Sequence, residues 1–147
     1  MKVAFDTNII ISRRVRIFPR SHYLSAIVLA EIISGAQNRS DLKLWNAIQD
    51  FAERSDRFLV PSAEDWLQAG LALQRLSQQS KRENFGSTPK FSPEERQRMF
   101  NDCLLAVSCR RAGVVVVTDN LKDFERISAV CRVKWLSGDE FFAPSHP

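Results

Sequence analysis

The segment Gly113-Val114-Val115-Val116-Val117-Thr118-Asp119-Asn120 is the most informative part of the sequence about the fold. Its four consecutive valines show no alternation of apolar and polar residues, which predicts a strand covered on both faces, as central parallel strands are. A helical pattern ends just before Gly113, and a short helical turn is expected around residues 122–127. Helices on both sides of a buried strand are typical of an α/β domain with a mainly parallel sheet.

Short apolar runs predict further strands, and helical patterns fill the spaces between them. The strands are expected at residues 2–5, 22–24, 58–60 and 133–136. Helices are expected to start near Ile9, Ser25, Ser40 and Ser62. The clearest helix start is Ser92, where Pro93 follows and Glu95 completes a capping box. The polar segment 77–91 is predicted to be the one long loop.

Two of these helices carry apolar residues at helical spacing, which predicts a buried face on each. After Ser40 this face consists of Leu42, Trp45, Ile48, Phe51 and Ala52. After Ser62 it consists of Trp66, Ala69, Leu73 and Leu76.

Length and composition set further limits. The 147 residues are 44% hydrophobic and 26% charged, and they contain no repeat or linker. We therefore expect one domain over residues 1–142 and a short flexible tail at 143–147. No apolar run approaches the roughly 20 residues that span a bilayer, and the start lacks a signal-peptide core, so a cytoplasmic protein is expected. Three cysteines without metal-ligand spacing predict buried, reduced thiols.

Three acidic residues stand where acids are rarely found. Asp6 directly follows an apolar strand, and Glu31 and Asp102 lie in the middle of helical patterns among apolar neighbours. Aspartate and glutamate are seldom buried unless they are paired or bound to a metal. Asp119 is a fourth candidate, because it ends the valine strand and ligands bind at the carboxyl ends of parallel strands.

Such acids would repel one another unless protons or a cation held them together. Two carboxylates about 4 Å apart repel by roughly 4 kcal/mol at an effective dielectric constant near 20. Oxygen ligands without histidine or cysteine favour Mg²⁺ or Mn²⁺, ions that support phosphodiester hydrolysis. Each acid also has an ordinary interpretation: Asp6 as a helix N-cap, Glu31 and Asp102 as solvent-facing residues, and Asp119 as a turn residue. Only their combination favours a metal site.

Four stretches of the sequence resemble, in order, the motifs of the PIN-domain nucleases, and more closely the VapC-type toxins of bacterial toxin–antitoxin pairs. These stretches are Val3-Ala4-Phe5-Asp6-Thr7-Asn8-Ile9, Ser25-Ala26-Ile27-Val28-Leu29-Ala30-Glu31-Ile32, Asn101-Asp102-Cys103-Leu104-Leu105-Ala106 and Val117-Thr118-Asp119-Asn120-Leu121-Lys122-Asp123-Phe124.

The resemblance implies a PIN-like α/β/α sandwich with a mainly parallel five-stranded sheet, and an endoribonuclease that depends on Mg²⁺ or Mn²⁺. It implies that Asp6, Glu31 and Asp102 bind metal and support attack by water. Asp123 matches the family's fourth acid, with Asp119 as a rival for that position. Whether one metal or two bind stays open.

The resemblance also suggests roles for the polar residues around the acids. Thr7, Asn8 and Thr118 are expected to hydrogen-bond the acids and orient them, with Asn120 as a further polar support. The neighbouring arginines are candidates for contacts with RNA phosphates, or else with a partner protein or solvent. They are Arg13, Arg14 and Arg16.

Partners follow from the resemblance alone. It implies a homodimer and a cognate VapB-type antitoxin whose C-terminal segment enters the acidic groove. Two alternatives remain: a PIN nuclease of RNA maturation, and a PIN-like module that binds without catalysis. A phosphatase of the Asp-x-Asp type fits poorly, because Asn8 stands where its second acid would be.

Overall fold

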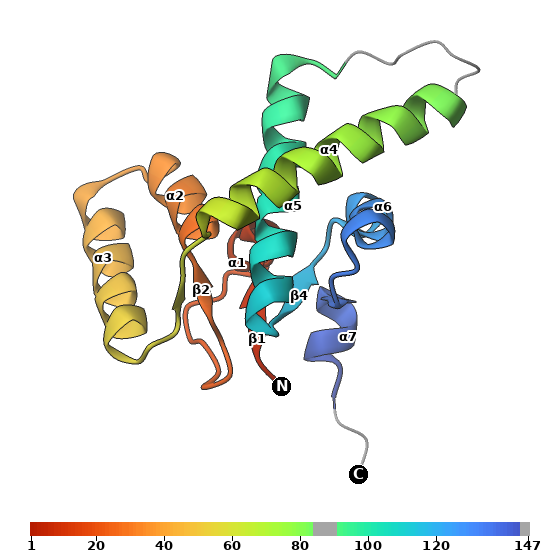
Figure 1. The fold of residues 1–147 in the computed structure, drawn as a ribbon. Helices are drawn as coiled ribbons and strands as arrows, with labels where there is room; N and C mark the ends of the chain where they lie inside the picture. Colours follow the sequence, from red (N-terminus) through yellow and green to blue (C-terminus); the bar gives the residue numbers. More distant parts are fainter. Residues whose placement is uncertain (84–90, 145–147) are drawn as a thin grey trace.

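The computed structural model describes residues 1–83 and 91–144, with the side chains of 81–83 left out (Figure 1). Strands and helices alternate along most of the chain, as predicted. Their bounds are β1 Val3–Phe5, α1 Thr7–Ser12, β2 Leu24–Ser25, α2 Ala26–Ser34, α3 Arg39–Arg54, β3 Phe58–Leu59, α4 Ala63–Glu83, α5 Pro93–Ala112, β4 Val115–Thr118, α6 Leu121–Cys131, β5 Trp135–Ser137 and α7 Gly138–Phe142.

The valine strand β4 is the centre of a three-stranded parallel sheet. It lies between β1 and β5, with Val3 opposite Val115 and Thr118 opposite Ser137. Val114, Val116, Val117 and Thr118 are buried, and Val115 is half-buried. The α5 helix passes in front of β1 and β4 in Figure 1. The prediction of a central parallel strand covered on both faces is confirmed.

The predicted continuous five-stranded sheet is not what the structure contains. Strands β2 and β3 pair in parallel as a separate two-stranded sheet. A single parallel bridge between Val3 and His22 joins the two sheets. There the N–H of Val3 donates to the Ser21 carbonyl at 2.9 Å, and the N–H of Tyr23 donates to the Val3 carbonyl at 2.7 Å. Because β1, β2 and β3 are only two or three residues long, no longer ladder forms between β1 and β2.

Three other expectations about helices need correction. Residues 77–83 continue α4 instead of starting a loop, and residues 84–90 lie outside the described part of the chain. In the predicted buried faces, Leu42, Phe51 and Trp66 are 38%, 61% and 52% exposed. Leu42 and Phe51 lie on α3, which packs against α2 and β3, whereas Trp66 lies on α4 with its ring 5.7 Å from the Phe100 ring of α5. Helix α7 was not expected, although Ser137 and Glu140 have the spacing of a capping box.

The helix caps follow the sequence closely. The Ser92 hydroxyl accepts the N–H of Glu95 at 3.1 Å, and Ser62 and Asp65 exchange hydrogen bonds at 2.9 and 3.1 Å. Gly113 ends α5 with a φ of 69°, a conformation that favours glycine.

Cys103, Cys109 and Cys131 are buried free thiols, as predicted. None of the helices in residues 1–83 and 91–144 has the length and hydrophobicity needed to cross a membrane. Of the predicted tail, 145–147 lie outside the described residues.

Candidate active site

Asp6 lies at the carboxyl end of β1 and has two roles. It is the N-cap of α1, since its Oδ1 accepts the N–H of Thr7 at 2.8 Å. Its Oδ2 accepts the Thr118 hydroxyl at 2.9 Å and the Asn8 amide at 3.2 Å. Only 5% of the residue is exposed. The capping interpretation of Asp6 is therefore correct, but it accounts for one carboxylate oxygen only.

Glu31 and Asp102 reach the same edge of the sheet from two helices. On α2, half-buried Glu31 accepts the Thr7 hydroxyl through Oε2 at 3.2 Å. On α5, Asp102 is 7% exposed and accepts the Asn120 amide at 3.3 Å. Neither residue is a freely solvated residue at a helix margin.

Asn120 and Thr118, at the end of β4, join these acids into one network. The Asn120 amide donates to Asp102 and also to Oδ2 of Asp123 at 3.0 Å, and the Asn120 backbone N–H donates to Oγ1 of Thr118 at 3.0 Å. The Asn8 amide donates to the same Oγ1 at 3.3 Å. We call Asp6, Glu31, Asp102 and Asp123 the acid cluster.

The acid cluster is electrostatically strained. Burial, followed by the charges of Asp6, Glu31 and Asp123, raises the pKa of Asp102 to about 8. Burial also raises the pKa of Asp6, against three hydrogen bonds that lower it, and burial raises the pKa of Glu31 with help from Asp6. None of the ion pairs in the described part of the chain involves the cluster.

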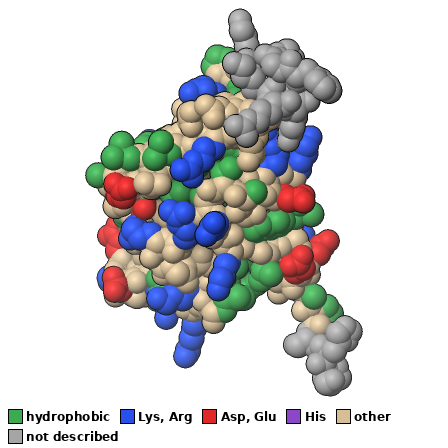
Figure 2. Space-filling model, turned by 45° about the vertical axis from the view of Figure 1, so that its right-hand side comes forward, with side chains coloured by type: hydrophobic (Ala, Val, Ile, Leu, Met, Phe, Trp, Pro, Cys, Tyr) green, Lys and Arg blue, Asp and Glu red, His purple; other side chains and the backbone are tan. Residues whose placement is uncertain are grey.

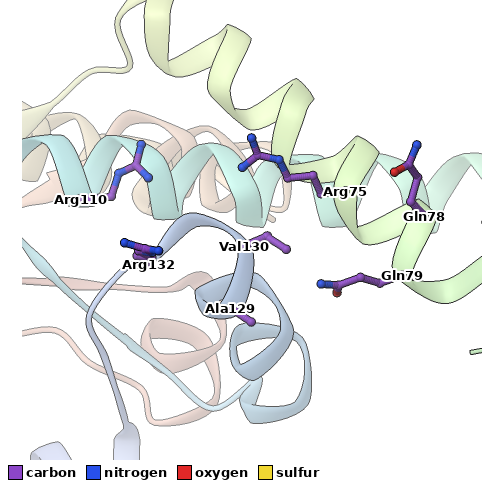
Figure 3. A pocket seen from close by; sticks show the side chains of 7 residues that line it. All are labelled: Arg75, Gln78, Gln79, Arg110, Ala129, Val130 and Arg132. Carbon is purple, nitrogen blue, oxygen red and sulfur yellow. The ribbon is translucent and has the colours of Figure 1, made fainter. Parts of the chain in front are cut away.

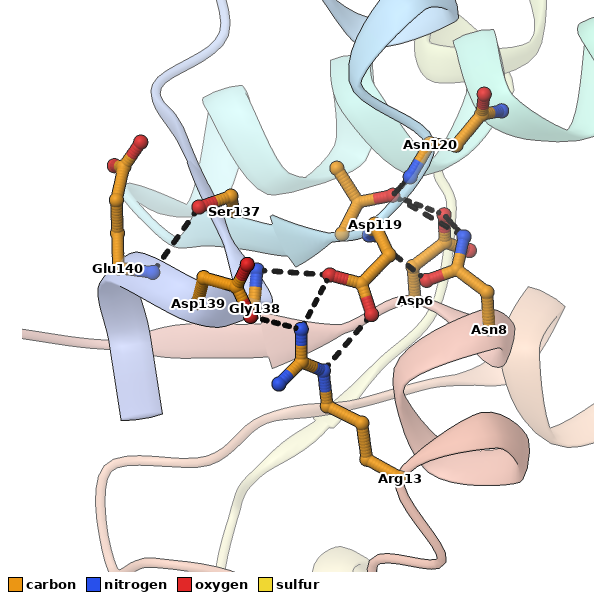
Figure 4. A network of polar contacts seen from close by, with 10 residues as sticks. Asp6, Asn8, Arg13, Asp119, Asn120, Ser137, Gly138, Asp139 and Glu140 are labelled. Carbon is orange, nitrogen blue, oxygen red and sulfur yellow. Dashed lines mark hydrogen bonds and ion pairs between the residues drawn. The ribbon is translucent and has the colours of Figure 1, made fainter. Parts of the chain in front are cut away.

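Asp119 points away from the acid cluster and pairs with Arg13 (Figure 4). Arg13 donates to its carboxylate at 2.8 and 2.9 Å, and to Asp139 at 2.8 Å. The N–H of Gly138 donates to Oδ1 of Asp119 at 3.1 Å. The hydrogen bonds from Arg13 lower the pKa of Asp119. We call Arg13, Asp119, Gly138 and Asp139 the arginine clamp.

The other two arginines near Asp6 are exposed. Arg14 has a positive φ of 53°, and Arg16 donates to the neighbouring Val15 carbonyl. The structure brings neither into the acid cluster.

Sequence reasoning missed Arg98 and Asp139. Arg98 is the charge that partly lowers the pKa of Asp102, and it lies four residues before Asp102 on α5, a spacing that places two side chains on one helix face. That spacing could have identified Arg98 from the sequence. No local pattern identifies Asp139, because it pairs with Arg13 across 126 residues.

Two pockets open beside Glu31. One of about 500 Å³ is lined by Glu31, Glu94, Gln97, Arg98 and Asn101 with Pro93. A largely apolar one of about 490 Å³ extends from Glu31 over Ile27, Val60, Pro61 and Trp66. Val60 and Trp66 are 55% and 52% exposed. We call the second pocket the Trp66 groove.

The carboxylates of the acid cluster are ligands that suit Mg²⁺ or Mn²⁺, but they do not stand close enough together to coordinate an ion. Within residues 1–83 and 91–144, no three acidic, histidine or cysteine side chains converge closely enough to hold an ion as they stand. All four donors are nevertheless carboxylates, which these ions prefer. After burial, the charges of Asp6, Glu31 and Asp123 raise the pKa of Asp102 and the charge of Asp6 raises that of Glu31, and none of the four forms an ion pair with a described residue. A bound cation would offset this repulsion, so the residues fit such an ion.

Comparison with known proteins agrees with the α/β fold described above. The sequence model of the PIN domain matches residues 3–130. The fold is similar to VapBC-1 from nontypeable Haemophilus influenzae, with 22% identity, a TM-score of 0.53, and coverage of 93% of this chain and 98% of that chain. VapBC2 from Rickettsia felis, bound to a promoter DNA fragment, gives 18% identity, a TM-score of 0.51, and coverage of 95% and 100%. No curated protein sequence matches the chain.

Proposed function

The chain belongs to the PIN domain family, and from this premise we propose that it is a metal-dependent endoribonuclease that hydrolyses RNA phosphodiester bonds. One observation carries the proposal. Four carboxylates from different parts of the chain meet at the carboxyl edge of a parallel sheet, where α/β proteins bind their ligands.

Asp6, Glu31 and Asp102 are the proposed metal-binding residues. Mg²⁺ or Mn²⁺ bound there would supply an activated water and charge compensation for the leaving oxygen. Asp123 is the better fourth acid, because the Asn120 amide holds it beside Asp102. Asp119 fits that role less well, since Arg13 already occupies its carboxylate.

The chain's own polar groups orient the carboxylates before any substrate arrives. Thr118 and Asn8 direct hydrogen bonds at Oδ2 of Asp6 and the Thr7 N–H donates to Oδ1, so one lone-pair site of Oδ1 stays available. The Asn120 amide spans Asp102 and Asp123, and the Thr7 hydroxyl fixes Glu31. Such support limits the reorganisation that the reaction requires.

We further propose that the chain is the toxin of a toxin–antitoxin pair, and that it forms a homodimer. The similar folds come from VapBC and FitAB complexes. The Trp66 groove supports a protein partner, since it exposes apolar side chains directly beside Glu31. An antitoxin segment lying in this groove would cover the acid cluster.

Cleavage of RNA by the purified protein tests the proposed activity. The protein is incubated with total RNA and Mg²⁺ or Mn²⁺, next to lanes with EDTA, Asp102→Asn and the matched control Asp50→Asn on exposed α3. We expect discrete fragments from the wild type and Asp50→Asn only. Folded, metal-supplemented protein that cuts no RNA would indicate a binding module instead.

A further inference from the structure

A second feature, separate from the acid cluster, is a basic pocket between α4, α5 and the end of α6 (Figure 3). It has a volume of about 520 Å³. Three arginines, Arg75, Arg110 and Arg132, line it together with Gln78 and Gln79. A smaller pocket of about 290 Å³ shares Arg110 and Arg132 and adds Lys134.

Among the described residues, none compensates the charge of this pocket. Neither pocket is lined by an acidic residue. Arg75 and Arg132 form no ion pair with any other described residue, and Arg110 donates only to the Cys131 carbonyl at 2.7 Å. Figure 2 shows Lys and Arg side chains gathered across the middle of one face, with acids towards its edges. Unpaired guanidinium groups that share a pocket favour an anionic ligand.

Helices α5 and α6 each run between the basic pocket and the acid cluster. On α5, Arg110 follows Asp102 by eight residues, which is about 12 Å along the helix axis. On α6, Asp123 lies in the first turn and Arg132 directly follows the last residue. Gly113 and Val114, which border the smaller pocket, precede β4, whereas Thr118 in the acidic network ends it. The pocket therefore lies about two helical turns from the acids.

We propose that this basic pocket binds the phosphodiester backbone of the RNA substrate outside the cleavage site. The inference rests on the proposed ribonuclease function, and it adds a second anchoring point for the same strand. Arginine guanidinium groups and glutamine amides recognise phosphate oxygens irrespective of base sequence. The pocket thus contributes affinity for long RNA and leaves the choice of cleavage sequence to the acidic edge.

RNA binding without metal tests the pocket directly. Fluorescence anisotropy of a labelled single-stranded RNA is followed in EDTA over a series of salt concentrations. For Arg75→Gln/Arg132→Gln we expect about tenfold weaker binding and a salt slope lower by roughly 1.4, or about 0.7 for each lost phosphate contact. The matched control is Arg39→Gln/Arg54→Gln on α3, which removes the same charge and should lose less than about twofold. Arg75→Gln alone serves as a second variant, because its exposed side chain has no hydrogen bond to other described residues.

Cleavage in Mg²⁺ or Mn²⁺ separates this inference from the proposed function. The double variant should lower kcat/KM for long RNA and leave cleavage of a dinucleotide unchanged. If the wild type cuts RNA and the double variant binds like its control, the pocket assignment is wrong and the nuclease stands. If the wild type neither binds nor cuts RNA, both proposals fail. Inorganic pyrophosphate that binds the wild type as tightly as RNA would assign the pocket to a small polyphosphate and overturn the strand-binding role.

Discussion

The charged form of Asp102 destabilises the folded protein, although the same carboxylate is a proposed metal ligand. Its pKa of about 8 lies above that of an unfolded aspartate, so the folded protein holds a proton that the unfolded chain releases. Stability without metal therefore falls as the pH rises from about 4 to 8. Asp102→Asn should raise the free energy of unfolding at pH 7 by at least about 1.4 kcal/mol, the equivalent of one pKa unit, while cleavage is lost. Urea denaturation at pH 5 and pH 7 checks this, and an unchanged pH profile would contradict it.

His22 gives the opposite dependence on pH. It is stacked on Phe18 with ring centroids 4.5 Å apart, and its Nε2 is buried without a partner among the described residues. Burial lowers its pKa from 6.5 to about 4, so between these pH values the unfolded chain binds a proton and the folded protein does not. This contribution is lost as the pH falls from about 6.5 to 4, by up to roughly 3 kcal/mol. His22→Phe should flatten the acid limb of the stability curve relative to the wild type, measured by thermal unfolding between those pH values.

Single residues were also the scale at which the sequence was most informative about the site. Asp6, Glu31 and Asp102 were identifiable because each is surrounded by apolar neighbours, and burial of an acid needs a reason. The orientation of Asp119 was not identifiable. Its partner Arg13 is 106 residues away, and the closeness of that pair depends on how the whole sheet is assembled.

Among the helices, the start of α7 is tightly fitted to the arginine clamp. A Cβ atom on Gly138 would lie 2.5 Å from both Arg13 Nε and Asp119 Oδ1, although its backbone needs no glycine conformation. Gly138→Ala should therefore displace the Arg13 side chain, disrupt the clamp and lower the free energy of unfolding. Gly70→Ala in α4 is the matched control, because its Cβ meets nothing within 4 Å and alanine favours a helix by about 1 kcal/mol. Equal effects of the two substitutions in chemical denaturation would argue against the close fit.

The helices also show where sequence patterns stop being informative. Ser92 and Ser62 marked their helix starts because capping is a contact between near neighbours in the chain. The extension of α4 through polar residues instead involves contacts between distant parts of the chain: Arg126 of α6 donates to the Ser80 hydroxyl at 2.8 Å. The exposure of Trp66 likewise depends on what covers that face, which helical spacing does not encode.

For the molecule as a whole, metal binding should be coupled to folding. A cation that binds only the folded protein adds about 2.7 kcal/mol at a concentration roughly 100 times its Kd. Mg²⁺ or Mn²⁺ should thus raise the Tm of the wild type and leave that of Asp102→Asn nearly unchanged, as measured by calorimetry. An equal rise in both proteins would mean that the ion binds elsewhere.

The parallel α/β arrangement as a whole followed from the sequence, whereas the division of the sheet did not. Apolar runs predicted all five strands, but their union in one sheet was inferred from a family resemblance. Strands of two residues leave too few backbone pairs for a pattern to show which ladder continues. The break between β1 and β2 is a property of the assembled backbone.

That break suggests how the protein opens. Within residues 1–83 and 91–144, one bridge at Val3 connects the backbone ladders of the two sheets, and α2, which carries Glu31, follows directly from β2. Amide protons of β2, β3 and α3 should therefore exchange with solvent deuterium sooner than those of β4, as a cooperative unit of lower local stability. Each such opening would carry Glu31 away from Asp6 and Asp102. The fraction of molecules able to cleave RNA would then depend on how often the Val3–His22 bridge between the two sheets is formed.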